Sequence, residues 1–176
     1  MRYSMAFDDR EGGLVTLKEE LKHLENYFLI QKERFRDRIN ISISIDPDVL
    51  DCLIPKLLIQ PLVENSFQHG FSRKTGNWSL RIRACIKEDS KVHVIIHDNG
   101  DGIPEEILNH LKETISSRNQ EDHYTQPLKL KEHIGLLNTN DRIRLLFSVG
   151  DGLKISSKEG EFTEIEIIFD ARRAYG

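Results

Sequence analysis

The chain has 176 residues with 25 basic and 29 acidic side chains, which give a formal net charge of −4 and a pI near 6.0. This length is enough for one domain with a buried core, or for one domain with an additional helix. No apolar run approaches the ~20 residues of a membrane-spanning helix, and the slight acidity leaves no basic footprint for nucleic acid. Two cysteines, Cys52 and Cys85, are too few for a disulfide framework, so we expect buried or neutral thiols in a reducing compartment.

The first predicted element is a helix with a clear start signal. Thr16 and Glu19 form a capping box, Thr-Leu-Lys-Glu, and predict a helix that runs to about Arg36. Its stripe positions alternate three and four apart, as in a heptad seam: Leu14, Leu17, Leu21, Leu24, Phe28, Gln31 and Phe35. Two interpretations remain open, because such a stripe can pack against its own domain or pair with a partner chain.

A strand and a second helix follow. Residues 39–45 alternate isoleucine with asparagine or serine and predict a strand with one wet face. The second helix is predicted from about Ile54 to His69, with Gly70 as its stop. Pro61 lies inside this pattern and should kink the helix or loosen one turn.

The second half of the chain adds four strands and two more helices. The strands are expected at 78–86, 92–96, 153–157 and 161–169, and the helices at 105–115 and 135–147. Residues 116–126 have almost no apolar content and predict a mobile loop. The sum is five strands and three helices after the leading helix, which indicates an α/β two-layer sandwich.

A glycine-rich motif stands at the end of the 92–96 strand. It reads Asp98-Asn99-Gly100-Asp101-Gly102, in which the glycines let the backbone approach a ligand and the aspartate can accept a hydrogen bond from an exocyclic amine such as that of adenine. Taken alone, the same residues also fit a plain Asp-Gly turn.

Two further motifs have the residue types of a phosphate and cation site. Glu64 and Asn65 project from one side of the second helix, and an amide oxygen beside a carboxylate suits a hard cation such as Mg²⁺. Gly135 opens a helix, whose free N–H groups suit phosphate. Each has an ordinary alternative, as a polar helix face and as a simple helix start.

Together and in this order, the motifs resemble the Bergerat ATP-binding fold of gyrase, Hsp90, histidine kinases and mismatch-repair ATPases. Within that fold the chain looks like sensor histidine kinases of the LytS/YesM type. The resemblance implies a mixed, mainly antiparallel five-stranded sheet with three helices on one face, plus a leading helix. It covers nearly the whole chain and rests on Glu25-Asn26-Tyr27 with Gln31-Lys32-x-Arg34-Phe35, the run Ile54 to Asn65 with its Gln-Pro-Leu-Val-Glu-Asn end, His69-Gly70, the Asp98 motif, His133-Ile134-Gly135-Leu136 and Gly160-x-x-Thr163.

The resemblance also implies roles for single residues. Asn65 would coordinate the Mg²⁺ that bridges the phosphates of ATP, with Glu64 in or next to that shell, and Asp98 would accept from the adenine amine. Residues from about 105 to 132 would form a lid over the nucleotide. The remaining nucleotide contacts would come from His69, Gly100, Gly102, Ile103, His133, Gly135, Leu136, Leu137 and Thr163.

The family further implies how the chain is organised. Residues 1–37 would be the C-terminal part of a dimerisation helix and residues 38–176 the catalytic domain, which passes the γ-phosphoryl group of ATP to a histidine. None of the seven histidines has the family's Asn-Pro-His-Phe context, so the acceptor would lie outside this fragment. The implied partners are the histidine-bearing helix, a second copy of the parent and a response regulator, with no nucleic acid. The fragment would lie on the cytoplasmic side of a membrane-anchored parent.

Four positions depart from the family or bear on the mechanism. Gln68 replaces a frequent basic residue, His133 a frequent glycine, and Phe162 a glycine of the closing motif. These departures motivate an alternative, an ATP-binding or ATP-sensing scaffold without phosphotransfer. Hydrolytic members of the wider superfamily place a glutamate four residues before the metal asparagine, where this chain has Pro61. Water activation should therefore be poor, because proline cannot act as a general base.

Overall fold

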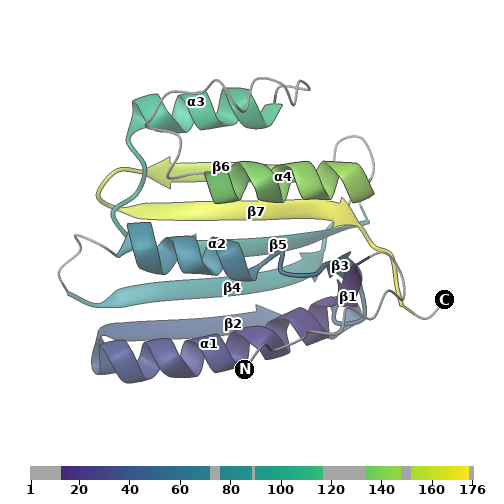
Figure 1. The fold of residues 1–176 in the computed structure, drawn as a ribbon, viewed down its shortest axis with the longest axis horizontal. Coiled ribbons are helices and arrows are strands. Elements are labelled where there is room, and N and C mark those ends of the chain that lie inside the picture. The colour runs from purple at the N-terminus through teal and green to yellow at the C-terminus, as the bar shows by residue number, and fades with distance from the viewer. Residues whose placement is uncertain (1–12, 72–75, 89, 117–133, 148–151, 175–176) are drawn as a thin grey trace, which may run out of the picture.

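A computed structural model describes residues 13–71, 76–88, 90–116, 134–147 and 152–174, and its centre is a five-stranded sheet (Figure 1). Neighbouring strands follow the order β2-β4-β5-β7-β6. β2 runs parallel to β4, and the other pairs are antiparallel. The strands are β2 (Ile39–Ile45), β4 (Trp78–Ile86), β5 (Lys91–Asp98), β6 (Gly152–Lys158) and β7 (Phe162–Asp170).

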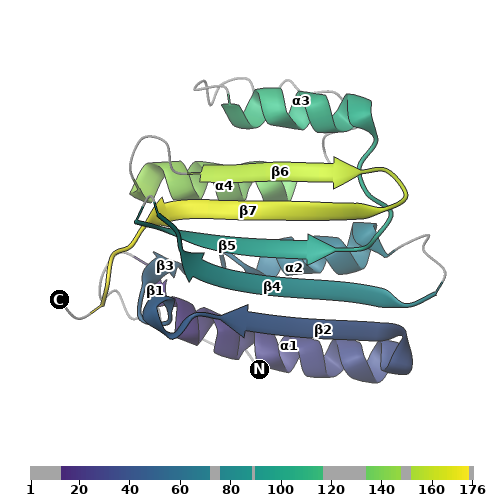
Figure 2. The same ribbon diagram turned by 180° about the vertical axis from the view of Figure 1, so that it is seen from behind.

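Helices cover one face of this sheet, as the two opposite views show (Figures 1 and 2). Three of them cover the sheet: α1 (Leu17–Phe35), α2 (Gln60–Asn65) with its π-helical continuation η3 (Ser66–Gly70), and α4 (Ile134–Leu146). α3 (Glu105–Ser116) lies beside the edge strand β6. The predicted two-layer α/β sandwich with a mixed, mainly antiparallel sheet is confirmed.

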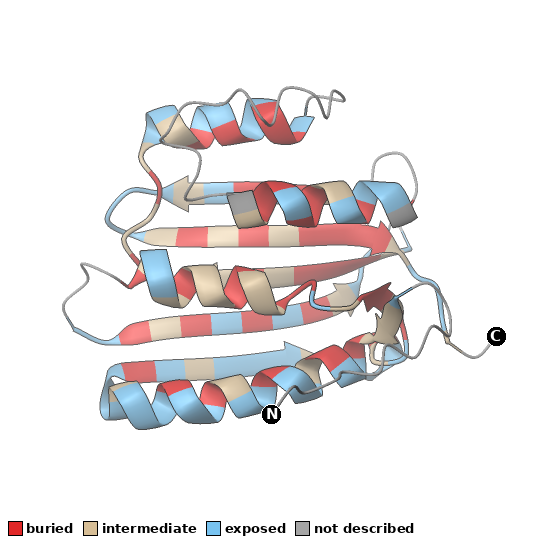
Figure 3. Ribbon diagram, viewed as in Figure 1, coloured by how far each residue is buried: buried red, intermediate tan, exposed pale blue. Residues whose placement is uncertain are grey.

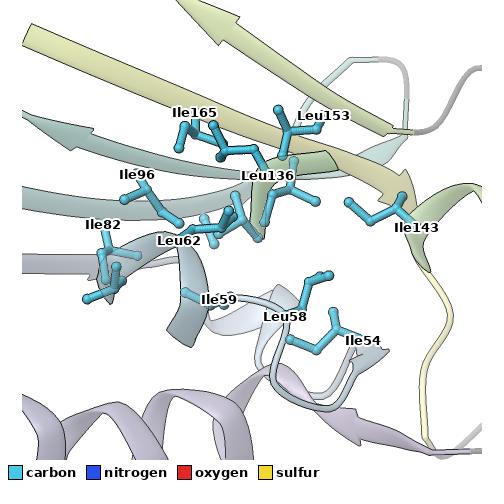
Figure 4. Close-up of a cluster of buried hydrophobic side chains, with 14 of the residues drawn as sticks. Ile54, Leu58, Ile59, Leu62, Ile82, Ile96, Leu136, Ile143, Leu153 and Ile165 are labelled. Carbon is cyan, nitrogen blue, oxygen red and sulfur yellow. The ribbon is translucent and has the colours of Figure 1, made fainter. Parts of the chain in front are cut away.

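The core fills the space between the sheet and the helices (Figure 3). Alternate strand residues point toward the helices because side chains of a strand alternate between its two faces. Leu80, Ile82 and Ile96 are at most 1% exposed and belong to the same cluster as Leu62 of α2 and Leu136 of α4. The close-up shows α2 and α4 directing their apolar side chains toward the sheet (Figure 4).

The predicted capping box at the start of α1 is present. The Thr16 hydroxyl accepts from the Glu19 backbone N–H at 3.2 Å, and the Glu19 carboxylate accepts from the Thr16 N–H at 2.9 Å. The backbone and hydroxyl hydrogen bonds from Thr16 lower the pKa of Glu19. α1 ends at Phe35, and the short 3₁₀ turn η1 (Arg36–Arg38) leads into β2.

The apolar stripe of α1 packs against its own domain. Leu17, Leu24 and Phe28 are at most 5% exposed and belong to the main core. This burial favours packing of the stripe against its own domain over pairing with a partner chain. Leu14, which the stripe included, lies instead in the short strand β1 (Leu14–Thr16), because the helix begins only after its Thr16 cap.

The predicted start of the second helix is wrong. Ile54 belongs to β3 (Leu53–Pro55), which pairs with β1 in a two-stranded antiparallel sheet. Leu57 then has φ of +58°, which no right-handed helix accepts, and α2 begins only at Gln60. Pro61 therefore lies in the first helical turn, where its missing N–H leaves no hydrogen bond broken, so the expected kink does not arise.

The remaining elements agree with the sequence to within one or two residues. The predicted strands and the helices at 105–115 and 135–147 are present, and the 3₁₀ turn η2 (Pro47–Val49) follows β2. The predicted mobile loop at 116–126 lies, apart from Ser116, outside the described residues. Both cysteines are free, and burial raises the pKa of the Cys52 thiol. No helix in the described part of the chain has the length and apolar character needed to cross a membrane.

Two leucines of α1 test whether this helix is part of the core. Leu24 is fully buried, whereas Leu29 is 64% exposed on the same helix. We expect Leu24→Ala to lower the free energy of unfolding by about 2–5 kcal/mol, because it leaves a cavity. Leu29→Ala, the matched control, should change it by less than about 0.5 kcal/mol. Chemical denaturation measures both, and equal effects would contradict the packing of α1 on this core.

Candidate functional site

A pocket lies between α2–η3, the end of β5 and the start of α4. Its lining comes from elements far apart in the sequence, which the sheet and the π-helical turn bring together. The sequence predicted seven of the lining residues: Asn65, His69, Asp98, Gly102, Ile103, Leu136 and Thr163. Three further residues complete the lining, namely Ser66, Gly70 and Ile165.

The most buried charged group of the pocket is Asp98, at the end of β5. This residue is 3% exposed. One carboxylate oxygen accepts from the Ser66 hydroxyl at 2.7 Å, and the other accepts from the Gly100 backbone N–H at 2.9 Å. A buried carboxylate is stable only with such donors, because burial removes its hydration. These two bonds fix both oxygens of Asp98 within the pocket.

Two glycines allow the backbone of η3 to touch the loop after β5. A Cβ on Gly100 would lie 2.1 Å from the carbonyl oxygen of Gly70, and a Cβ on Gly70 would lie 2.9 Å from a carboxylate oxygen of Asp98. The Asp101 N–H donates to the same Gly70 carbonyl. A side chain at Gly100 would therefore push the helix away from the strand end.

The same loop is tied to the β6–β7 hairpin on its other side. Gly102 has φ of +66°, and a Cβ there would lie 2.1 Å from the Lys158 carbonyl oxygen. The Ile103 N–H donates to the Ser157 hydroxyl at 2.9 Å, which lies 3.1 Å from the Thr163 hydroxyl. Thr163 is also the cross-strand neighbour of Asp98. The sheet thus positions both residues at the same depth in the pocket.

A second part of the pocket joins α2 to the start of α4. The side-chain nitrogen of Asn65 is buried and has no hydrogen-bond partner. A Cβ on Gly135 would lie 3.5 Å from that nitrogen, so the Asn65 amide faces the first turn of α4. The first N–H groups of a helix have no intrahelical partner and attract anions. This corner therefore combines a free amide with an anion-attracting helix end.

The residues here fit a metal that keeps most of its own water. In the described part of the chain no group of three or more His, Cys, Asp or Glu side chains could hold a metal ion. Mg²⁺ commonly takes only one or two protein ligands and completes its shell with water and substrate phosphates. A site whose one protein ligand is the side-chain oxygen of Asn65 would match this requirement, since only the oxygen of an amide can bind a cation.

Four predicted site residues do not line the pocket. Glu64 points to Gln60, whose side-chain amide donates to it at 2.8 Å, and Leu137 is 4% exposed in the main core. Gly100 acts through its close approach to Gly70, and Gly135 lies opposite the Asn65 amide at an ordinary contact distance. His133 lies outside the described residues.

Phe162, which replaces a glycine of the family's closing motif, packs outside the pocket. Phe162 stacks on His97 with ring centroids 5.6 Å apart and an angle of 5° between the rings. Both residues are sequence neighbours of pocket residues, Thr163 and Asp98, and alternation along the strands puts them on the opposite face of the sheet. The phenyl ring therefore occupies no space in the pocket.

Comparison with known proteins decides the family. Residues 51–173 match the family of histidine kinase-, DNA gyrase B- and HSP90-like ATPases. The chain belongs to this family. Residues 1–39 also match the histidine kinase family.

Several curated relatives are sensor histidine kinases or sensor proteins. The chain is 35% identical to sensor histidine kinase YesM of Bacillus subtilis over 90% of its own length and 24% of the relative's, and 31% identical to YpdA of Escherichia coli over 90% and 25%. It is 45% identical to sensor protein LytS of Oceanobacillus iheyensis over 54% of its length and 16% of that protein. The chain thus spans about a quarter or less of these relatives. The family and the LytS/YesM likeness expected from the sequence are confirmed.

Solved structures agree on the fold. The catalytic domain of histidine kinase ThkA superposes with a TM-score of 0.57 at 17% identity, covering 90% of this chain and 97% of that one. The histidine kinase domain of a blue-light activated kinase from Erythrobacter litoralis gives 0.56 at 17% identity, covering 89% and 62%.

Two glycine variants test the close approach of η3 and β5. Gly100→Ala places a methyl group against the Gly70 carbonyl, so we expect it to lower the free energy of unfolding by about 1–3 kcal/mol or more. Gly135→Ala is the matched control, since its methyl would make an ordinary contact and alanine favours a helix. Thermal unfolding measures both. A Gly100→Ala protein as stable as the Gly135→Ala protein would contradict the geometry.

Proposed function

We propose that this chain is the catalytic ATP-binding domain of a two-component sensor histidine kinase, which binds Mg·ATP and transfers the γ-phosphoryl group to a histidine outside these residues. The observation that carries this proposal is the buried Asp98 carboxylate, held in one pocket with the unpartnered amide of Asn65. The family match and the sensor kinase relatives support it.

The pocket around Asp98 suits a purine with an exocyclic amine. A carboxylate only accepts hydrogen bonds, and here it is fixed by Ser66 and Gly100, so an adenine amine would find an acceptor that is already oriented. Ile103, Leu136 and Ile165 supply apolar walls for the flat base. The Thr163 hydroxyl, paired with Ser157, offers a further polar contact through water.

The corner at Asn65 suits the phosphate groups. We assign Asn65 as the protein ligand of Mg²⁺ and the first turn of α4, from Gly135 to Leu137, as the phosphate cradle, with His69 at the rim and His133 as a further contact. Bound Mg²⁺ supplies neutralisation of the phosphate charge. Glu64 would lie in or next to this shell, where one of its carboxylate oxygens accepts from the Gln60 side chain.

Catalysis would rest on positioning. Phosphoryl transfer needs an aligned nucleophile and charge stabilisation more than covalent chemistry by the protein. Pro61 occupies the place of the hydrolytic glutamate, which leaves ATP for transfer to a protein nucleophile rather than to water. Residues 105–132 would close over the nucleotide as a lid, of which α3 is the first part.

The wider assembly follows from the same proposal. Residues 1–37 would be the end of the dimerisation helix and residues 38–176 the catalytic domain of a membrane-anchored, homodimeric parent. The domain would lie on the cytoplasmic side and bind the histidine-bearing helix of the parent. A response regulator would be the further partner of the parent. The match of residues 1–39 to the histidine kinase family supports this arrangement.

A second candidate function is an ATP-binding scaffold without phosphotransfer. It is favoured by Gln68, an exposed neutral residue on η3 where many kinases carry a basic one. Such a domain would bind nucleotide in the same pocket but leave an offered histidine unmodified.

Nucleotide binding tests the pocket. We expect calorimetry to show Mg·ATP binding, which Asp98→Asn weakens about 10- to 100-fold because a charge-assisted hydrogen bond is lost. Asn65→Ala should remove the gain in affinity that Mg²⁺ provides while ATP in a chelator still binds. Absence of nucleotide binding by the wild-type domain would refute the proposal.

Transfer to a supplied histidine separates the two candidate functions. The domain is incubated with labelled Mg·ATP and a fragment that carries the histidine helix of the family. We expect labelling of this fragment, none of a fragment with histidine replaced by alanine, and none with the Asn65→Ala domain. A wild-type domain that binds Mg·ATP but leaves the intact fragment unlabelled would favour the scaffold.

A further inference from the structure

The turn that precedes α2 is held by a buried carboxylate of α1. Glu20 is 1% exposed, and its two oxygens accept from backbone N–H groups of the turn. One oxygen accepts from Leu57 at 2.9 Å, and the other from Ile59 at 3.1 Å and Gln60 at 3.4 Å. These donors stand at the start of α2, where a helix has no acceptors of its own. Glu20 therefore caps α2 from another helix.

The carbonyl groups of the same turn are held from the opposite side of the site. The guanidinium of Arg142, on α4, donates to the carbonyl oxygens of Lys56 and Leu57. The turn also contains the positive φ of Leu57, a conformation that a leucine adopts only when its surroundings impose it. Two charged side chains, one acceptor and one donor, thus determine the path of the chain into α2.

The other end of the α2–η3 segment also rests on α1. The Phe67 ring packs edge-on against Tyr27, with centroids 5.5 Å apart, and stacks on Phe35 at 6.1 Å. Burial first, and the charge of Glu64 second, raise the pKa of Tyr27 to about 12. α1 therefore contacts the segment at both ends.

We propose that Glu20 and Arg142 are positioning residues of the nucleotide site. Their hydrogen bonds to the turn before α2 (the grip) fix the position of Asn65. Because Glu20 belongs to α1, the position of Asn65 also depends on the position of α1. This inference rests on the proposed function of Asn65 as the Mg²⁺ ligand. Asn65 lies only five residues, about 7.5 Å, from the capped Gln60. A shift of the turn therefore reaches Asn65 directly, since one helical turn has no room to absorb it.

The recognition of the base is expected to depend less on this grip than the position of Asn65 does. One donor to Asp98, Ser66, follows Asn65 on η3, but Asp98 itself is anchored to β5 and its other donor, Gly100, lies in the same strand-end loop. Loss of the grip should therefore reduce the Mg²⁺-dependent part of ATP binding much more than the Mg²⁺-free part. A side chain that served stability alone would instead affect both parts equally.

The test compares Glu20→Gln and Arg142→Gln with Glu33→Gln, a matched loss of one exposed carboxylate on α1. Calorimetry measures the ATP affinity of each protein with Mg²⁺ and with a chelator. In the first two variants, the increase in ATP affinity that Mg²⁺ provides should be about tenfold smaller than in the wild type, since the lost bonds are charge-assisted. Their ATP affinity in the chelator should fall by less than about twofold. Glu33→Gln should match the wild type.

Hydrogen exchange of the nucleotide-free proteins supplies an independent readout. The Ile59 and Gln60 amides should exchange faster in Glu20→Gln than in Glu33→Gln, because their acceptor oxygen has lost its charge. Unchanged binding in both grip variants, or equal losses with and without Mg²⁺, would overturn the inference. If Glu20→Gln fails to fold, the exposed Arg142→Gln decides alone. A wild-type domain that binds no ATP would refute the proposed function first, and the inference with it.

Discussion

The Asp98 carboxylate is the group on which the geometry of the pocket depends. It lies almost completely out of water, so both of its oxygens need donors. Ser66 can donate only if η3 lies directly against the end of β5, and that approach is possible only because Gly70 and Gly100 carry no Cβ. One desolvated charge thus determines the separation of a helix and a strand, and with it the width of the site.

Much of the fold was predictable because its signals are local. The alternation in residues 39–45 and the Thr16–Glu19 capping box need no tertiary information, and both were found as expected. The start of α2 was not predictable in this way. Its apolar spacing continues back to Ile54, but pairing with β1 and the positive φ of Leu57 override that pattern.

The residues of the candidate site also differ in whether the sequence alone can predict them. Residues with a distinctive chemical pattern, such as Asp98 and Asn65, could be selected from the sequence alone. Ser66 and Glu20 could not, because a serine in a helix and a glutamate in a charged helix both look like ordinary surface residues. Their partners lie 32 and 37 or more positions away in the sequence, so only the folded chain reveals the role of either side chain.

The parallel pairing of β2 with β4 has a kinetic consequence. Two neighbouring parallel strands need a long crossover, and here the chain between them contains β3, α2 and η3. A helix as short as α2 has no stability of its own in water. It therefore depends on packing against α1 and the sheet, so these residues are expected to fold late.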